Sequence, residues 1–199
     1  MGALTLVLGG ARSGKSGHAE RLAAASGWEV VYVATATAGD EEMAERIARH
    51  RAARPPGWQT VEAALDLDLR LPAEVPERAC ALIDCLSVWL SNELLRRLER
   101  TATDDTIAPA LAAAVEREQD ERTERLLGWA AQRSGPTIVV SNEVGSGVVP
   151  PYPLGRLYRD LLGRANQTLA AAAAAVHFVV AGIAVDLRRL ALPEADAGR

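Results

Sequence analysis

Short apolar runs alternate along the chain with longer stretches in which apolar positions recur every three or four residues. The short runs predict strands, because a strand buried on both faces of a parallel sheet carries apolar residues in succession. The predicted strands span residues 3–8, 29–34, 80–85, 137–141 and 177–182. The longer stretches have the spacing of amphipathic helices and span residues 16–25, 41–54, 88–98, 106–133 and 157–173. This alternation predicts one α/β domain over residues 1–199, with a mostly parallel sheet covered by helices on both faces.

Capping and helix-breaking residues support these boundaries. Asp40 can cap the second helix, which has acidic residues in its first turn and arginines near its end, and the dipeptide that begins at Pro55 stops it. Pro109 suits the first turn of the helix that Thr106 opens. The polar stretch at residues 101–106 is predicted to be a mobile connection between two helices.

The totals narrow the class of protein. A chain of 199 residues with 49% apolar content can bury one substantial core. The net charge of −4 and the interleaving of arginine with glutamate leave no basic face, which argues against nucleic acid as a main partner. The longest uncharged apolar stretch changes midway from helix formers to β-branched residues, so it predicts a helix end and a buried strand and no transmembrane segment. The N-terminus lacks a secretory leader, which favours a cytoplasmic protein.

The chain has two cysteines, Cys80 and Cys85, which lie five residues apart in a predicted strand. At that spacing their side chains are predicted to point to opposite faces, so they cannot easily form a disulfide or share a metal. We expect both to be reduced and partly buried, as is usual in the cytoplasm.

The first predicted strand ends in a glycine-rich turn that leads directly into the first helix. The turn consists of Gly9, Gly10, Ala11, Arg12, Ser13, Gly14, Lys15 and Ser16. Such a turn surrounds phosphates with backbone amides, its lysine reaches the β and γ oxygens, and its serine is a ligand for Mg²⁺. Lys15 is also the only lysine among the 22 basic residues. The motif predicts a P-loop NTPase-like (RecA-like) fold that binds a nucleoside triphosphate, and the alternative is a turn that merely packs helix on strand.

Three further positions offer chemistry, each with a structural alternative. Asp84 ends the third predicted strand, where a carboxylate can hold Mg²⁺ or can simply close the strand. His50 shares one helical face with Met43 and Ile47, so it is either a packing residue or a nucleophile toward phosphorus. The glycine-rich loop at residues 141–150 lies where open α/β sheets bind ligands, and otherwise it is an ordinary connection.

The other two histidines are interpreted as structural residues without a chemical role. His18 lies early in the first helix and is expected at the surface, whereas His177 lies inside an apolar strand and is expected in the core. Neither has other metal-ligating residues around it in the sequence, so no histidine-bound metal is predicted.

Five segments carry a family resemblance. They are GGARSGKSGHAE at residues 9–20, YVATA at 32–36, the stretch at 40–62, SNEVGSGVVP at 141–150, and RDLLGRANQTLA with VVAGI near the end. Together they resemble the bifunctional adenosylcobinamide kinase / adenosylcobinamide-phosphate guanylyltransferase family of cobalamin biosynthesis. The resemblance implies one enzyme that phosphorylates the aminopropanol hydroxyl of adenosylcobinamide and then transfers GMP from GTP onto that phosphate, releasing pyrophosphate. The second step passes through a guanylylated histidine, which by motif position is His50.

The resemblance also implies which residues contact the nucleotide. Besides the glycine-rich turn, these are Ala34, Thr35, Ala36, His50, Arg51, Ala52, Ala53, Glu62 and Asp84. Ser16 and Asp84 are the expected ligands of Mg²⁺, and GTP and ATP are the expected nucleotide substrates. A homotrimer is implied by the resemblance alone.

Two other functions stay open on the sequence. A small-molecule kinase would use only the γ-phosphate, with His50 structural, and would form no covalent nucleotide. A binding module switched by GTP would report the bound nucleotide to a protein partner through the loop at residues 141–150 and would turn over no cobinamide.

Overall fold

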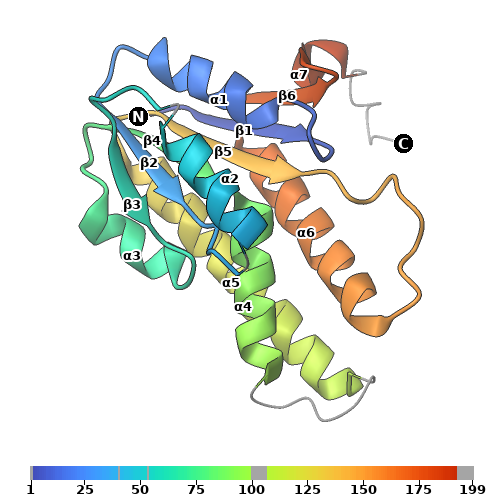
Figure 1. Cartoon of the computed structure of the whole chain (residues 1–199). Coiled ribbons are helices and arrows are strands. Elements are labelled where there is room, and N and C mark those ends of the chain that lie inside the picture. Colours follow the sequence, from blue (N-terminus) through green and yellow to red (C-terminus); the bar gives the residue numbers. More distant parts are fainter. Residues whose placement is uncertain (1, 40, 53, 100–106, 192–199) are drawn as a thin grey trace.

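A seven-stranded sheet runs through the middle of the molecule, and helices lie on either side of it (Figure 1). The computed structural model describes residues 2–39, 41–52, 54–99 and 107–191. The strands are β1 (Leu4–Gly9), β2 (Val30–Ala34), β3 (Gln59–Glu62), β4 (Cys80–Asp84), β5 (Thr137–Asn142), β6 (Ala175–Val180) and β7 (Ile183–Asp186). The helices are α1 (Lys15–Ala24), α2 (Glu41–Ala52), α3 (Leu67–Glu74), α4 (Leu86–Glu99), α5 (Pro109–Gln132), α6 (Pro153–Ala172) and α7 (Leu187–Leu190).

The strand order is β3-β2-β4-β5-β1-β6-β7, and every neighbouring pair is parallel except β6 with β7. The prediction of a mostly parallel sheet is therefore confirmed. Strands β1 and β4, which end in the glycine-rich turn and in Asp84, are separated only by β5. Because parallel strands end at the same edge of the sheet, the two predicted phosphate and metal elements lie close together.

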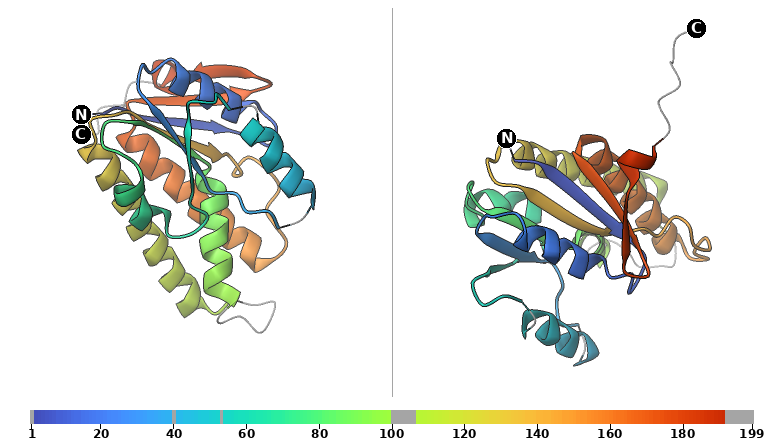
Figure 2. Two further views of the ribbon diagram at one scale, coloured as in Figure 1. Left: turned by 60° about the vertical axis from the view of Figure 1, so that its left-hand side comes forward. Right: turned by 90° about the horizontal axis from the view of Figure 1, so that it is seen from above.

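Helices lie on both faces of the sheet (Figure 2), and an apolar cluster packs on each face. On one face, Ala19 and Ala23 of α1 pack against alternate residues of the central strands, including Val7 and Leu82. On the other face, α3, α4, α5 and α6 form a larger layer. Helix α2 lies at the periphery in both views. Strands buried on both sides explain why β1, β2, β4 and β5 read as continuous apolar runs.

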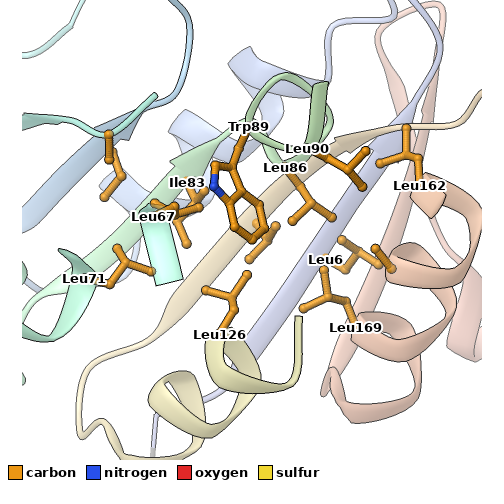
Figure 3. Packing of buried hydrophobic residues seen from close by; sticks show 14 of the residues in the cluster. Leu6, Leu67, Leu71, Ile83, Leu86, Trp89, Leu90, Leu126, Leu162 and Leu169 are labelled. Carbon is orange, nitrogen blue, oxygen red and sulfur yellow. The ribbon is translucent and has the colours of Figure 1, made fainter. Parts of the chain in front are cut away.

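Trp89 of α4 is fully buried at the centre of the larger layer (Figure 3). Leucines from four helices and apolar residues from the strands pack in the same cluster. The labelled members are Leu6, Leu67, Leu71, Ile83, Leu86, Leu90, Leu126, Leu162 and Leu169. This packing anchors α4, which begins two residues after Asp84 ends β4.

A buried group of charges links three of these helices. Arg122 of α5 donates hydrogen bonds to Asp68 of α3 at 3.0 Å and to Glu93 of α4 at 3.3 Å. Asp68 also accepts a bond from Arg125 at 2.8 Å, and Glu93 also pairs with Arg96. The side chain of Asp68 is fully buried, and those of Glu93 and Arg122 are nearly so. Each buried carboxylate therefore depends on neighbouring guanidinium groups for its compensation.

Four elements in the structure have no counterpart in the sequence prediction. Strand β3 is mostly exposed at the sheet edge, so it lacks an apolar run, and α3 contains Pro72 inside its short length. Strand β7 follows a tight turn in which Ala181 and Gly182 both have positive φ, and it returns antiparallel to β6. The short helix α7 continues directly from it. The expectations placed on Asp40, on Thr106 and on the connection at 101–106 lie outside the described residues.

Both cysteines are free and buried. The prediction that they point to opposite faces was wrong. Strand β4 ends at Asp84, so Cys85 leaves the strand alternation, and both thiols pack in the cluster under α1. Among the described helices, none has the length and apolar character needed to cross a bilayer.

Candidate active site

The glycine-rich turn wraps the junction between β1 and α1. A side chain at Gly9 would place its Cβ 2.5 Å from the hydroxyl oxygen of Ser13 and 2.6 Å from the carbonyl oxygen of Val179. Gly14, which precedes α1, has φ of 92°, a conformation that glycine adopts without strain. Lys15 donates a hydrogen bond to the carbonyl oxygen of Gly10 at 3.1 Å. A hydrogen bond from the first residue of α1 therefore links back to the turn.

A cavity of about 380 Å³ opens beside this turn at the carboxyl edge of the strands. Lys15 and Ser16 form one side of it, Asp84 lies at the end of β4, and His50 reaches it from α2. Thus a lysine, a hydroxyl, a carboxylate and an imidazole from three distant segments share one cavity. That volume is within the usual range for a small-molecule site.

Strands β2 and β4 hold Asp84 in place. The hydroxyl of Tyr32 donates a hydrogen bond to Asp84 Oδ2 at 2.8 Å, and the two residues lie on the same face of adjacent parallel strands. The buried hydroxyl of Thr35 accepts from the N–H of Cys85 at 2.7 Å and donates to the carbonyl oxygen of the same residue at 2.8 Å. Burial, together with the charge of Asp84, raises the pKa of Tyr32, so its hydroxyl stays protonated and remains a donor.

Helix α2 carries His50 in its last turn, and contacts from that turn and from Arg54 just beyond it connect the helix to the sheet. The guanidinium carbon of Arg54 lies 3.5 Å from the centre of the Tyr32 ring. Arg54 also donates to the hydroxyl of Thr60 in β3 at 3.1 Å. Arg51 pairs with Glu62, again in β3. These contacts place the histidine end of α2 over the cavity.

The predicted site residues divide into two groups. Those in the cavity wall are Ala11, Arg12, Lys15, Ser16, Ala34, Ala36, His50 and Asp84. Those that the structure describes outside the wall are Gly9, Gly10, Ser13, Gly14, Thr35, Arg51, Ala52 and Glu62. Ala53 lies outside the described residues. Most residues of the second group belong to the glycine-rich turn or connect α2 with β3, next to the residues that line the cavity.

Glu20 is a carboxylate near this site that the sequence analysis did not single out. Burial and the negative charge of Asp84 raise the pKa of Glu20, whereas His50, Arg54 and Arg21 act in the opposite direction. Glu20 therefore lies within the electrostatic reach of both Asp84 and the histidine helix. Glu20 is half-buried on α1 and is not among the residues that line the cavity.

His18 and His177 form a pair, which the sequence analysis did not predict. Nε2 of His18 lies 2.9 Å from Nδ1 of His177. The core position expected for His177 was wrong, and so was the surface position expected for His18, because both side chains are half-buried. Burial, with the nearby charges of His177 and Arg21, lowers the pKa of His18. Within the described part of the chain, no three His, Cys, Asp or Glu side chains gather as a metal site.

Several cavity residues were missed in the sequence analysis. Tyr32 and Arg54 line the cavity, as do Asn92 of α4 and Asn142 at the end of β5. Tyr32 lies in the segment YVATA and Arg54 follows His50 by four residues, so both belong to segments that had been noted for other residues. Their mutual contact depends on pairing between segments far apart in sequence, which no local pattern signals.

The sequence is similar to known proteins over nearly its whole length. Residues 5–187 match the family described as cobinamide kinase / cobinamide phosphate guanyltransferase. A relative from Pseudomonas aeruginosa, named bifunctional adenosylcobalamin biosynthesis protein CobP, is 46% identical over 183 residues, covering 92% of this chain and 96% of the relative. The corresponding protein of Escherichia coli strain K12, CobU, is 39% identical over 185 residues, covering 93% and 99%.

A solved structure of an ATPase from a type III secretion system shares the fold at 11% identity, with a TM-score of 0.51 over 98% of this chain and 60% of that one. This likeness supports the P-loop architecture. The family match and the two relatives extend over nearly the whole sequence, and the lysine, serine, histidine and aspartate singled out from that sequence line one cavity. The chain belongs to the cobinamide kinase / cobinamide phosphate guanyltransferase family.

Proposed function

We propose that this protein phosphorylates adenosylcobinamide with a nucleoside triphosphate and then transfers GMP from GTP onto the product through His50. The family assignment supplies the two activities. The observation that carries the residue-level proposal is that His50, Lys15, Ser16 and Asp84 line one cavity although they come from separate segments.

The kinase step depends mainly on positioning. Backbone amides of the glycine-rich turn and the Lys15 ammonium hold the β- and γ-phosphates, while the cobinamide hydroxyl approaches from the open side of the cavity. Such a step requires alignment and charge stabilisation and no covalent enzyme intermediate.

The guanylyl step uses His50 as the nucleophile. A neutral imidazole nitrogen attacks the α-phosphorus of GTP, a nitrogen–phosphorus bond forms, and the bond to the bridging oxygen breaks. Pyrophosphate leaves with the electron pair, and the other ring nitrogen keeps its proton. The phosphate of adenosylcobinamide phosphate then attacks the same phosphorus, which releases His50 and gives the GDP-linked product.

The donor set of the cavity suits Mg²⁺. Ser16 and Asp84 present a hydroxyl and a carboxylate, the oxygen ligands that Mg²⁺ prefers, and Tyr32 keeps one carboxylate oxygen oriented. When bound, the ion would neutralise charge on the phosphates. A homotrimer, a cytoplasmic location and the use of ATP as well as GTP are part of the proposal on the grounds of the sequence resemblance.

The test is the intact mass of the protein after incubation with GTP and Mg²⁺. We expect the wild type to gain one GMP, labile to acid and stable to alkali, and to lose it on addition of pyrophosphate. His50→Ala should gain none, whereas His18→Ala, the matched histidine control, should gain the adduct. Adduct on His50→Ala would refute the assignment of the nucleophile.

The same assay separates the two other functions. A kinase that uses only the γ-phosphate would form ADP or GDP with cobinamide and show no adduct on any variant. A GTP-switched binding module would bind GTP and show neither the adduct nor cobinamide turnover.

A further inference from the structure

Arg54 lies two residues beyond the end of α2, on the chain segment that leaves the His50 helix. Its backbone N–H donates to the carbonyl oxygen of Arg51 at 3.3 Å, so its position follows that of the last helical turn. Its side chain lines the same cavity as His50 and Lys15. The cavity wall therefore contains two cations from different segments: Arg54, next to the His50 helix, and the lysine of the glycine-rich turn.

The guanidinium of Arg54 rests on a rigid support. It stacks on the ring of Tyr32, a buried side chain whose hydroxyl is held by Asp84. An arginine on an aromatic face keeps its charge and its planar set of donors. Burial of the ring and the Tyr32–Asp84 hydrogen bond hold Tyr32 in place, so the stack positions the guanidinium near the carboxylate.

The guanidinium of Arg54 has few interactions with the rest of the described chain. One terminal nitrogen donates to Thr60, whereas Nε is buried and has no hydrogen-bond partner among the described residues. No carboxylate of the described chain lies within ion-pair distance of Arg54, in contrast to Arg51, which pairs with Glu62. A buried donor without a hydrogen-bond partner, on a cation that forms no close ion pair among the described residues, is suited to an anionic group entering the cavity.

The guanylyl step requires such a cation at the α-phosphate. Attack by His50 builds negative charge on the non-bridging oxygens of that phosphate. Lys15 bonds to the turn itself through Gly10, and its role in P-loops is at the β- and γ-phosphates. Arg54 is attached to the last turn of the helix that carries His50. Its guanidinium can therefore contact the α-phosphate that His50 attacks.

We propose that Arg54 is a catalytic residue of guanylyl transfer, with its guanidinium contacting a non-bridging oxygen of the α-phosphate while His50 attacks. This inference rests on the proposed function. The kinase step transfers the γ-phosphoryl group and leaves the α-phosphate unchanged, so it needs this contact far less.

The experiment measures the single-turnover rate of GMP adduct formation at saturating GTP for wild type, Arg54→Gln and Arg54→Lys. We expect the rate to fall on the order of 100-fold in Arg54→Gln, the usual loss when one transition-state donor is removed. Arg54→Lys should lie between the two, because it keeps the charge and loses the planar fork. Arg117→Gln, which removes an exposed arginine of α5, is the matched control and should react at the wild-type rate.

ATP-dependent phosphorylation of adenosylcobinamide is measured on the same variants and should change by no more than a few-fold. An Arg54→Gln protein that forms the adduct at the wild-type rate, or whose whole defect disappears at saturating GTP, would overturn the role of Arg54. Equal losses in both activities would show a structural role and overturn it as well. Absence of an adduct on the wild type would instead refute the proposed function, and the inference with it.

Discussion

The buried charges around Arg122 lead to a sharp prediction about stability. Arg122→Met keeps an unbranched, shorter side chain and removes its charge, which leaves Asp68 and Glu93 buried with one fewer partner each. Removing one partner of a buried ion pair costs about 3–5 kcal/mol. Asp68 keeps Arg125 and Glu93 keeps Arg96, so we expect the lower end, about 3 kcal/mol. For a chain of 199 residues this corresponds to a fall of roughly 6–12 °C in Tm.

Urea unfolding followed by circular dichroism measures this change in the free energy of unfolding. Arg189→Met is the matched control, because Arg189 is 87% exposed and pairs with Asp186 only at 3.5 Å. Its effect should stay within about 0.5 kcal/mol. Adding Glu93→Gln to Arg122→Met should recover part of the loss, since a buried carboxylate without compensation is the source of the cost. A change below about 1 kcal/mol in Arg122→Met would refute this reasoning.

Two further predictions concern the histidine pair and the thiols. The folded pKa of His18 is lowered, so the unfolded chain binds more protons as pH falls below about 6.5, and stability should decrease from pH 7.5 to 5.5. Urea unfolding at both pH values should show a smaller decrease in His18→Gln; an equal decrease would contradict the prediction. Burial raises the pKa of Cys80 and of Cys85, so a thiol reagent at pH 7.5 should label neither in the native protein and both in denaturant. Rapid native labelling would show that a thiol is accessible.

Much of the fold could be predicted because its determinants are local. The runs that became β1, β2, β4 and β5 are apolar on both faces, and strands of that kind belong in a covered parallel sheet. The glycine-rich turn has its own signature, since Gly9 and Gly14 occupy backbone positions that other residues fill poorly. Family membership follows from the same local segments taken together.

The elements and contacts that the sequence did not predict depend on residues far apart in the chain or on positions without a local pattern. Strand β3 has no apolar run, because it lies at an edge, and β7 depends on a reversal through Gly182. His18 and His177 are 159 residues apart in sequence, so no spacing could relate them. Cys85 lies in the same cluster as Cys80 because β4 ends at Asp84, one residue before the end of the predicted strand.

By itself, the sequence determined the type of fold and the glycine-rich turn, and it singled out His50 through a family motif. Only the tertiary structure decided that His50 and Lys15 share a cavity with Asp84, and that Tyr32 connects this carboxylate to Arg54. The reason is that apolar periodicity and turn chemistry depend on residues close together in sequence. The cavity, in contrast, depends on which strands lie side by side in the sheet. Placing β4 and β2 side by side, with α2 closing back over them, brings together side chains that have no relation along the chain.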